Sequence, residues 1–313
     1  MQYINTLREG QRISEIYLCK GKVDAKTKAG KSYYSLTLQD KTGTVSGKIW
    51  DLSSGIDHFE AMDYVKIDGD VTRYQNALQL NIRRLRKAAP GEYLPEDYLP
   101  RSPFDQDVMF AELMHYVGTV KNQYLHQLLQ EFFVNDSQLA AAFRSHSAAK
   151  RVHHSFVGGL LQHTLGVVKI CDFFAKQYSM LNRDLLITAA MLHDIGKLQE
   201  LADFPANDYT DAGQMLGHIV IGVEMVGEKA RAIEGFPAKT LVELKHCILA
   251  HHGEFEFGSP KKPAIAEALA LYYADNADAK LEILTEIFGD QNVGDGWLGF
   301  NQLLESNIRR TGK

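Results

Sequence analysis

Apolar and polar residues alternate along residues 10–87, and this two-residue period is typical of half-buried β-strands. In the clearest predicted strand, successive side chains divide into an apolar and a polar face, with Tyr34, Leu36 and Leu38 opposite Tyr33, Ser35, Thr37 and Gln39. The alternation recurs further along the chain, at residues 45–50, 65–71 and 78–82. Turn-forming residues separate the strands, at 28–31, 40–43 and 74–77. Residues 52–61 have room for a short helix between the third and fourth strands.

Strand, strand, strand, helix, strand, strand is the order of an OB-fold, a small Greek-key barrel. We therefore expect an all-β OB-fold domain over residues 1–87. The second and third strands of such barrels commonly contact oligonucleotides.

The alternation stops at residues 88–104, where four of the eight prolines lie, and this composition predicts a stiff, semi-extended linker. Beyond the linker, apolar residues follow helical spacing, first at Val108, Leu113 and Val117, then at Leu125, Leu128, Leu129, Phe132 and Phe133. No later stretch has a strong strand pattern. Residues 105–313 are therefore expected to form an all-helical domain, with supporting helices up to residue 150 and a frayed tail at residues 307–313.

Composition places the chain among globular proteins, because 313 residues with 45% hydrophobic content and a net charge of −5 can form two domains. No apolar run has the length of a membrane span, and the first residues lack the pattern of a signal peptide. The cysteines, Cys19, Cys171 and Cys247, are far apart and form no CxxC pair. They predict reduced thiols in a cytoplasmic protein without membrane association.

Charge is distributed unevenly between the two predicted parts. Residues 1–89 hold 15 Lys and Arg against 10 Asp and Glu, a balance of +5, and residues 90–313 hold 19 against 29, a balance of −10. A basic module joined to an acidic one suggests that the first captures a polyanion on which the second acts. Lysines that protect strand edges from aggregation would explain the same surplus.

Aromatic and cationic side chains lie together on the outward face of the predicted second and third strands. We expect this face to bind nucleic acid through Tyr33, Lys48 and Trp50, with help from Lys22, Lys31 and Arg73. Aromatic rings stack on bases while cations follow the phosphates, a combination that binds single strands with little sequence preference. Trp50 packed under the short helix is the alternative. The amino-acid sequence of residues 21–27 and 34–50 is similar to that of nucleic-acid-binding OB domains of the anticodon-binding type.

An adjacent histidine and aspartate interrupt the apolar run at residues 189–197. On a helix His193 and Asp194 can reach toward one point, and Lys197 lies on the same face, where it can meet a phosphate. A hydrogen-bonded His-Asp pair is the alternative for these residues alone. Further polar residues lie in apolar, helix-like segments, at His163, His218, His251, His252 and Asp275. Unpaired burial of so many polar groups would be costly, so a shared metal centre is the simpler explanation.

The order H…HD…H…HH…D over residues 150–285 resembles the HD-domain phosphohydrolase superfamily, specifically its two-metal members. We predict one ion held by His163, His193, Asp194 and Asp275 and a second held by Asp194, His218 and His251, with Asp194 bridging. His252 is either a further ligand of the second ion or a donor to phosphate. Imidazole and carboxylate ligands without thiolate suit Mn²⁺, Fe²⁺, Co²⁺ or Zn²⁺. The same resemblance places the first ligand at His163, so His153 and His154 are expected at the substrate entrance, with an exposed structural pair as the alternative.

The combination of an OB domain, a proline-bearing linker and a two-metal HD domain resembles the bacterial YhaM-type 3'-5' exoribonucleases over essentially the full length. Membership implies manganese-dependent removal of nucleotides from the 3' ends of single-stranded RNA, and also activity on single-stranded DNA. A hydroxide between two ions would attack phosphorus, with Asp194 and Lys197 as the catalytic residues, and release nucleoside 5'-monophosphates.

Two other classes of function fit parts of the sequence. An HD phosphohydrolase of small or cyclic nucleotides would explain the adjacent His251 and His252, but residues 253–260 lack the Gly-Tyr-Pro of that branch. A non-enzymatic single-strand-binding protein would explain the barrel alone. The sequence leaves open which RNAs are targets and whether chains assemble as a homo-oligomer.

Overall fold

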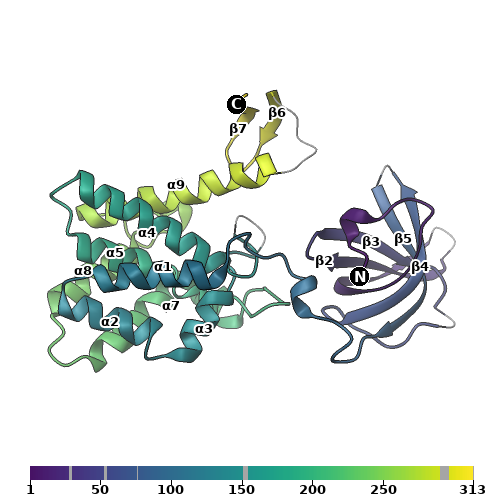
Figure 1. The fold of residues 1–313 in the computed structure, drawn as a ribbon, viewed down its shortest axis with the longest axis horizontal. Helices are drawn as coiled ribbons and strands as arrows, with labels where there is room; N and C mark the ends of the chain where they lie inside the picture. The colour runs from purple at the N-terminus through teal and green to yellow at the C-terminus, as the bar shows by residue number, and fades with distance from the viewer. Residues whose placement is uncertain (28–29, 53–54, 76, 151–153, 290–295, 313) are drawn as a thin grey trace. The chain divides into compact units, whose positions relative to one another are not determined.

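The structure is a computed structural model that describes residues 1–27, 30–52, 55–75, 77–150, 154–289 and 296–312. The chain divides into two compact units (Figure 1). The first comprises residues 1–101 and 204–206, and the second comprises residues 102–203 and 207–313. No helix in the described ranges is long and apolar enough to cross a membrane.

The first unit is a closed five-stranded barrel in the strand order β1-β2-β3-β5-β4 (Figure 1). Its strands are β1 (Arg12–Lys26), β2 (Ser32–Asp40), β3 (Gly43–Ile49), β4 (Tyr64–Tyr74) and β5 (Ala77–Lys87). Neighbouring strands are antiparallel except for β3 and β5, which pair in parallel. The predicted OB-fold barrel is confirmed.

The barrel core forms because alternate residues of each strand face inward. Leu38 of β2 lies opposite Val45 of β3, and both are buried, as is Leu36. Thr37, between the two leucines, is exposed. The two-residue period of the sequence therefore identified the buried face of β2 correctly, although Gln39 is also buried, with Nε2 donating to the carbonyl of Tyr98 at 3.0 Å.

The helix expected at residues 52–61 is absent from the described part of that segment. Gly55 has a positive φ of 74°, and Ile56 forms an isolated bridge with Leu85 of β5. Phe59 inserts its side chain into the barrel core, where it is 1% exposed. Aspartate and glycine disfavour a helix here, and burial of the Phe59 ring anchors the segment to the barrel core.

Much of the predicted linker belongs to the barrel unit. Tyr93 stacks on Tyr64 with ring centroids 3.9 Å apart, and Tyr98 is buried. A short 3₁₀ helix, η2 (Pro95–Asp97), lies between Tyr93 and Tyr98 in the sequence. The boundary between the units falls after residue 101, because aromatic side chains attach the preceding residues to β4.

The second unit is helical from residue 106 to residue 289 within its described part. Its helices are α1 (Gln106–Thr119), α2 (Gln123–Phe133), α3 (Ser137–Ser145), α4 (Gly159–Gln177), α5 (Arg183–Leu192), α6 (Lys197–Glu200), α7 (Asp211–Ala232), α8 (Ala238–Leu249) and α9 (Ala266–Gly289). Asp105 and Asn122 cap α1 and α2 by accepting hydrogen bonds from backbone N–H groups of the first turn. The predicted core residues of α2 are buried, whereas Val108 is exposed and Met109 occupies the inward position on α1.

The chain beyond α9 differs from the expectation of an all-helical domain with a frayed tail. Strands β6 (Gly296–Asn301) and β7 (Ser306–Arg310) form an antiparallel hairpin (Figure 1). Asn301 Oδ1 accepts from the backbone N–H groups of Leu303 and Leu304, which closes the turn. The strands are short and a bulge next to Gly299 interrupts their alternation, so the sequence pattern was too weak to indicate them.

Candidate metal centre

Helices far apart in the sequence bring the predicted ligands to one place in the second unit. His163 lies on α4, and His193 and Asp194 directly follow α5. Of the remaining predicted ligands, His218 lies on α7, His251 and His252 follow the end of α8, and Asp275 lies on α9. All of them have low solvent exposure, and His193 and His251 are fully buried.

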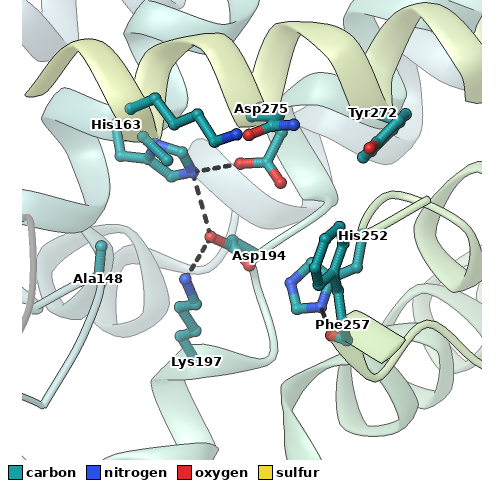
Figure 2. Close-up of a pocket in the computed structure, with 11 residues that line it drawn as sticks. Ala148, His163, Asp194, Lys197, His252, Phe257, Tyr272 and Asp275 are labelled. Atoms are coloured by element: carbon teal, nitrogen blue, oxygen red, sulfur yellow. Dashed lines mark hydrogen bonds and ion pairs between the residues drawn. The ribbon is translucent and has the colours of Figure 1, made fainter. Parts of the chain in front are cut away.

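The first cluster gathers around the Nε2 atom of His163 (Figure 2). This atom lies 3.1 Å from Asp275 Oδ1, 3.2 Å from His193 Nε2 and 3.4 Å from Asp194 Oδ2. One ligand atom from each of His163, His193 and Asp275 lies within 4.8 Å of the other two, close enough to hold a single metal ion. These contacts join the predicted ligands of the first ion.

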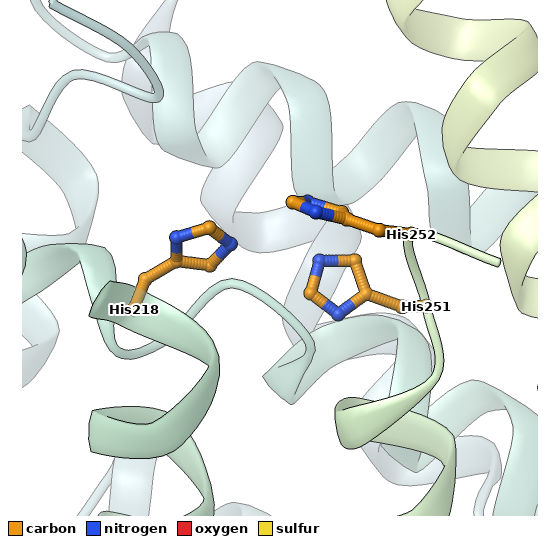
Figure 3. A group of neighbouring side chains, drawn as sticks. All are labelled: His218, His251 and His252. Atoms are coloured by element: carbon orange, nitrogen blue, oxygen red, sulfur yellow. The ribbon is translucent and has the colours of Figure 1, made fainter. Parts of the chain in front are cut away.

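The second cluster consists of His218, His251 and His252, whose rings face one another (Figure 3). Their ring nitrogens lie within 4.8 Å of one another. Asp194 Oδ1 lies 3.5 Å from His218 Nε2 and 3.7 Å from His251 Nε2. Asp194 therefore presents Oδ2 to the first cluster and Oδ1 to the second.

Hydrogen bonds at Nδ1 set the tautomer of each clustered histidine. His193, His251 and His252 lie 2.7–2.9 Å from backbone carbonyl oxygens through Nδ1. Carbonyl oxygens only accept, so each of these Nδ1 atoms donates and each Nε2 keeps its lone pair in the neutral ring. His163 Nδ1 and His218 Nδ1 likewise face carboxylates, at 2.7 and 2.9 Å. The Nε2 atoms are therefore arranged as ligands.

Three buried polar atoms in the centre have no hydrogen-bond partner among the described residues, namely Asp194 Oδ1, His218 Nε2 and His251 Nε2. Buried polar atoms are almost always paired, so an orphaned group of this kind needs an explanation. All three are electron-pair donors that converge on one point, as the contacts to Asp194 Oδ1 show. A divalent cation would satisfy all three at once, so the residues fit a metal site.

The electrostatics of the centre also favour a cation. Burial alone would lower the pKa of His163, but hydrogen bonds to Asp194, Asp275 and Asp278 raise that pKa well above its usual value. Burial next to His252 and His193 holds the pKa of His251 well below its usual value. Positive charge is thus favoured strongly at the first cluster, and the second cluster keeps neutral imidazoles that can act as ligands.

Lys197 is at the position that the sequence predicted, on the same side as Asp194. Its Nζ lies 2.6 Å from Asp194 Oδ2, and it lines a pocket of about 290 Å³ over the first cluster together with His252 and Asp275 (Figure 2). Burial alone would lower the pKa of Lys197, but Asp194 raises it. Lys197 is therefore a cation at the floor of a pocket.

The backbone around His218 is adapted to its position. Gly217 has φ 72° and ψ 157°, which breaks α7 in a conformation that glycine adopts without strain. The break lets the backbone N–H of His218 donate to Glu200 Oε1 at 3.0 Å. A side chain at Gly196, the glycine of the predicted His-Asp-Ile-Gly stretch, would overlap the carbonyl oxygen of His218. Glycine at this position permits the close approach of α6 and α7.

Two carboxylates that orient ligands were not identified from the sequence. Glu200 Oε1 accepts from Nδ1 of His218 at 2.9 Å, and Asp278 Oδ2 accepts from Nδ1 of His163 at 2.7 Å. Such partners fix ring orientation and raise the basicity of a ligand. Asp278 lies at i+3 from Asp275, on the same face of α9, and this spacing was the available signal. Glu200 had no comparable signal.

We expect Glu200→Gln to weaken metal binding about 10- to 100-fold, because the neutral amide loses the charge that holds His218 in its ligand tautomer. Titration calorimetry with Mn²⁺ on the intact protein measures this, and Glu224→Gln on the same helix as His218 serves as the control. Unchanged Mn²⁺ affinity in Glu200→Gln would show that Glu200 does not orient a ligand.

The entrance role predicted for His154 does not agree with its position, and His153 lies outside the described residues. His154 is 2% exposed, and its Nε2 lies 3.2 Å from Asp278 Oδ2. It lines a different pocket, together with Gln162 and Asp278. His154 is therefore buried next to His163, with ring centroids 5.2 Å apart, and does not line the pocket that contains Lys197.

On the barrel, the predicted aromatic pair is present on the outer surface. The rings of Tyr33 and Trp50 stack with centroids 4.6 Å apart, and Trp50 is 43% exposed, so it does not pack under a helix. Lys48 Nζ lies 5.7 Å from the centre of the Tyr33 ring. Trp50 Nε1 donates to Asn81 Oδ1 at 3.2 Å, which fixes the indole. These side chains form one aromatic and cationic surface.

The other predicted cations of the barrel are placed differently. Lys22 donates to the carbonyl of Phe59 at 2.7 Å and lies 3.7 Å from Glu60. Arg73 pairs with Glu9 at 3.1 Å, while Lys31 is exposed. Lys22 and Arg73 are thus engaged by the barrel's own groups, and Lys48 also donates to Ser35 Oγ at 2.5 Å. Lys48 nevertheless lies next to the Tyr33 ring, and Lys31 is exposed.

Comparison with protein families agrees with the two units. Residues 160–280 match the HD domain, and residues 17–88 match the OB-fold nucleic acid binding domain. An HD domain implies dependence on divalent metal, and the OB-fold supports binding of single-stranded nucleic acid.

Curated relatives cover nearly the whole chain. The 3'-5' exoribonuclease YhaM of Bacillus velezensis is 34% identical over 274 residues, which is 87% of this chain and 86% of that protein. YhaM of Geobacillus sp. strain WCH70 is 34% identical, over 88% of this chain and 84% of that protein. YhaM of Listeria innocua is 32% identical over 91% of each. The chain therefore belongs to the YhaM family of 3'-5' exoribonucleases.

Proposed function

We propose that this protein removes nucleotides from the 3' end of single-stranded RNA by hydrolysis at a centre of two divalent ions. The observation that carries the proposal is the position of Asp194, whose two carboxylate oxygens face separate histidine clusters. A bridging carboxylate between nitrogen and oxygen ligands is suited to a pair of ions that act on one phosphate.

The contacts of each cluster support a ligand assignment. His163, His193, Asp194 and Asp275 would hold one ion. Asp194, His218 and His251 would hold the other, with His252 as a further ligand or as a donor to phosphate. We propose Mn²⁺ on the family resemblance, and the ligand types are equally compatible with Fe²⁺, Co²⁺ or Zn²⁺.

Divalent ions at such a centre lower the pKa of water and neutralise the negative charge that develops on a phosphate during hydrolysis. The histidine and aspartate side chains that line the pocket are the proposed metal ligands, and Lys197 is paired with Asp194. We therefore propose water as the nucleophile. Lys197, which points into the pocket beside Asp194, is placed to hold a non-bridging oxygen of the scissile phosphate (Figure 2).

The barrel supplies affinity for the strand. Tyr33 and Trp50 stack on bases, while Lys48 and Lys31 contact phosphates. This surface selects unpaired strands because duplex bases do not present a free face for stacking. Single-stranded DNA has the same bases and phosphates and would be a second substrate.

Product analysis tests the proposal. With Mn²⁺ present, we expect 3'-hydroxyl RNA to yield nucleoside 5'-monophosphates and a shortened strand that keeps its 3'-hydroxyl, because water attacks phosphorus and the 3' oxygen of the preceding nucleotide leaves. Chromatography of the released nucleotides makes the measurement. Chelation of the metal should stop release, and Mn²⁺ should restore it.

Nucleoside 3'-monophosphates as products would contradict the scheme. A cyclic dinucleotide and a nucleoside triphosphate assayed in parallel distinguish the alternative of a small-nucleotide phosphohydrolase. Faster hydrolysis of either one than of RNA would favour that alternative, and binding of RNA without any hydrolysis would favour a non-enzymatic protein.

A further inference from the structure

The pocket above the metal centre extends along one face of α9. Tyr272, Asn276 and Lys280 follow one another at i, i+4 and i+8, and all three line the pocket. Asp275, a proposed metal ligand, lies on the same face between Tyr272 and Lys280. Along α9, the aromatic ring of Tyr272 is thus on the N-terminal side of Asp275 and the ammonium of Lys280 is on its C-terminal side.

An aromatic wall stands at the Tyr272 end of the pocket. Phe257 lines the pocket and is nevertheless 58% exposed. The neighbouring ligand His252 holds the segment by donating from Nδ1 to the carbonyl of Phe257 at 2.9 Å. Figure 2 shows Tyr272 and Phe257 on the side of His252, away from His163 and Lys197.

The position of Tyr272 is fixed by a close approach of the backbone. Gly253 has φ 77°, and any side chain there would overlap the ring of Tyr272. Glycine therefore lets the Tyr272 ring come close to the backbone of the loop that follows α8. The Tyr272 side of the wall is thus held in place before any ligand arrives, which reduces the entropy cost of binding.

The polar side chains of the α9 face are available to a ligand. Asn276 and Lys280 have no hydrogen bond or ion pair with other residues in the described part of the chain. Lys280 is exposed. An amide can pair with a base edge or a sugar hydroxyl, and an ammonium is suited to phosphate.

We propose that this pocket is the subsite for the 3'-terminal nucleotide of the substrate, with its base stacked on the wall formed by Phe257 and Tyr272. The proposal rests on the exonuclease function proposed above. The scissile phosphate lies at the metal centre next to Asp275, and Lys280 contacts the phosphate of the preceding nucleotide. The strand therefore runs from Lys280 toward Tyr272 in the 5' to 3' direction.

The dimensions of the pocket agree with a single nucleotide. Its volume of about 290 Å³ is just below the usual range for small-molecule sites, about 300–1,000 Å³. Tyr272 and Lys280 are separated by eight residues of helix, which corresponds to about 12 Å at a rise of about 1.5 Å per residue. The face is thus long enough for contacts on both sides of one phosphodiester.

Equilibrium binding separates the base from the rest of the nucleotide. The intact protein with Mn²⁺ should bind adenosine 5'-monophosphate on the order of 5- to 150-fold more tightly than ribose 5-phosphate, the range expected for one stacked base. In Phe257→Ala this preference should fall toward one. Phe255→Ala is the matched control, because Phe255 lies with Phe257 on the short 3₁₀ helix η3 (Phe255–Phe257), is 62% exposed and does not line the pocket.

Kinetics on RNA test the same subsite and the strand direction. An RNA that ends in an abasic ribose should raise KM for the unmodified protein, and Phe257→Ala should show little further rise on that RNA while kcat on ordinary RNA changes little. Lys280→Ala should reduce the salt dependence of binding by a slope of about 0.7, whereas Lys239→Ala on α8 should leave it unchanged.

Equal preference for adenosine 5'-monophosphate in the unmodified protein and in Phe257→Ala would overturn the subsite even if RNA is degraded normally. Failure of the unmodified protein to release nucleotides from RNA would instead contradict the proposed function. In that case the binding ratio still decides whether the pocket holds a base.

Discussion

Replacing Asp194 by asparagine should reduce the rate of nucleotide release on the order of 10³-fold or more, the largest effect expected for a single change in this protein. Its two oxygens face the two histidine clusters separately, so loss of the charge weakens both metal sites at once. In the proposed assignment each of the other ligands serves a single ion. The metal content of the purified variant, measured by elemental analysis, should therefore fall at both sites.

A structural effect can be separated from this loss. Asparagine has nearly the shape of aspartate, but it leaves the ammonium of Lys197 without its carboxylate partner at 2.6 Å. The thermal unfolding of Asp194→Asn should be compared with that of Asp211→Asn, which changes an exposed aspartate at the start of α7. A folded Asp194→Asn protein that keeps normal metal content and rate would refute the bridging role.

Replacing Trp50 by alanine should raise the dissociation constant for single-stranded RNA on the order of 5- to 150-fold, the equivalent of about 1–3 kcal/mol for one stacked base. Trp50 is 43% exposed and its ring is held by Tyr33 and Asn81, so its free face is ready for stacking. The rate on saturating short RNA should stay the same because the metal ligands belong to the other unit.

Trp297→Ala provides the control, because this second tryptophan is 71% exposed on the hairpin of β6 and β7. Lys48→Ala should lower the slope of log affinity against log salt by about 0.7, the value for one phosphate contact on a single strand. Equal affinities for Trp50→Ala and the unmodified protein, measured by fluorescence anisotropy with a labelled RNA, would mean that the barrel does not grip RNA through this surface.

Periodicity in the sequence predicted the architecture because burial repeats with the period of the backbone. Leu36 and Leu38 marked the inner face of β2, and the apolar spacing after residue 105 marked the helices. The proposed metal ligands could also be selected from the sequence, since histidines and aspartates buried in apolar helical segments need a common partner. The structure brings His163 to 3.1 Å from Asp275 and His218 to 3.5 Å from Asp194.

Sequence patterns were less informative wherever one local contact decides the conformation. Phe59 anchors residues 55–61 in the barrel core, where a helix was expected. The hairpin of β6 and β7 contains a bulge that hides its alternation. Both segments are short, so a single feature sets their conformation: the burial of Phe59 in the first, and the extra residue of the bulge in the second.

Residue types and periodicity were enough to select the chemically competent side chains and most of the buried faces of the strands and helices, with Val108 and Gln39 as exceptions. The assignment of each Asp194 oxygen to its histidines, and the hydrogen bonds of Glu200 and Asp278 to His218 and His163, follow from the packing of the helices. Asp278 and His163 are 115 residues apart in the chain, and Glu200 and His218 are 18 apart. Hydrogen bonds depend on separations of a few tenths of an ångström, and those separations are set by the packing of whole helices rather than by any local pattern.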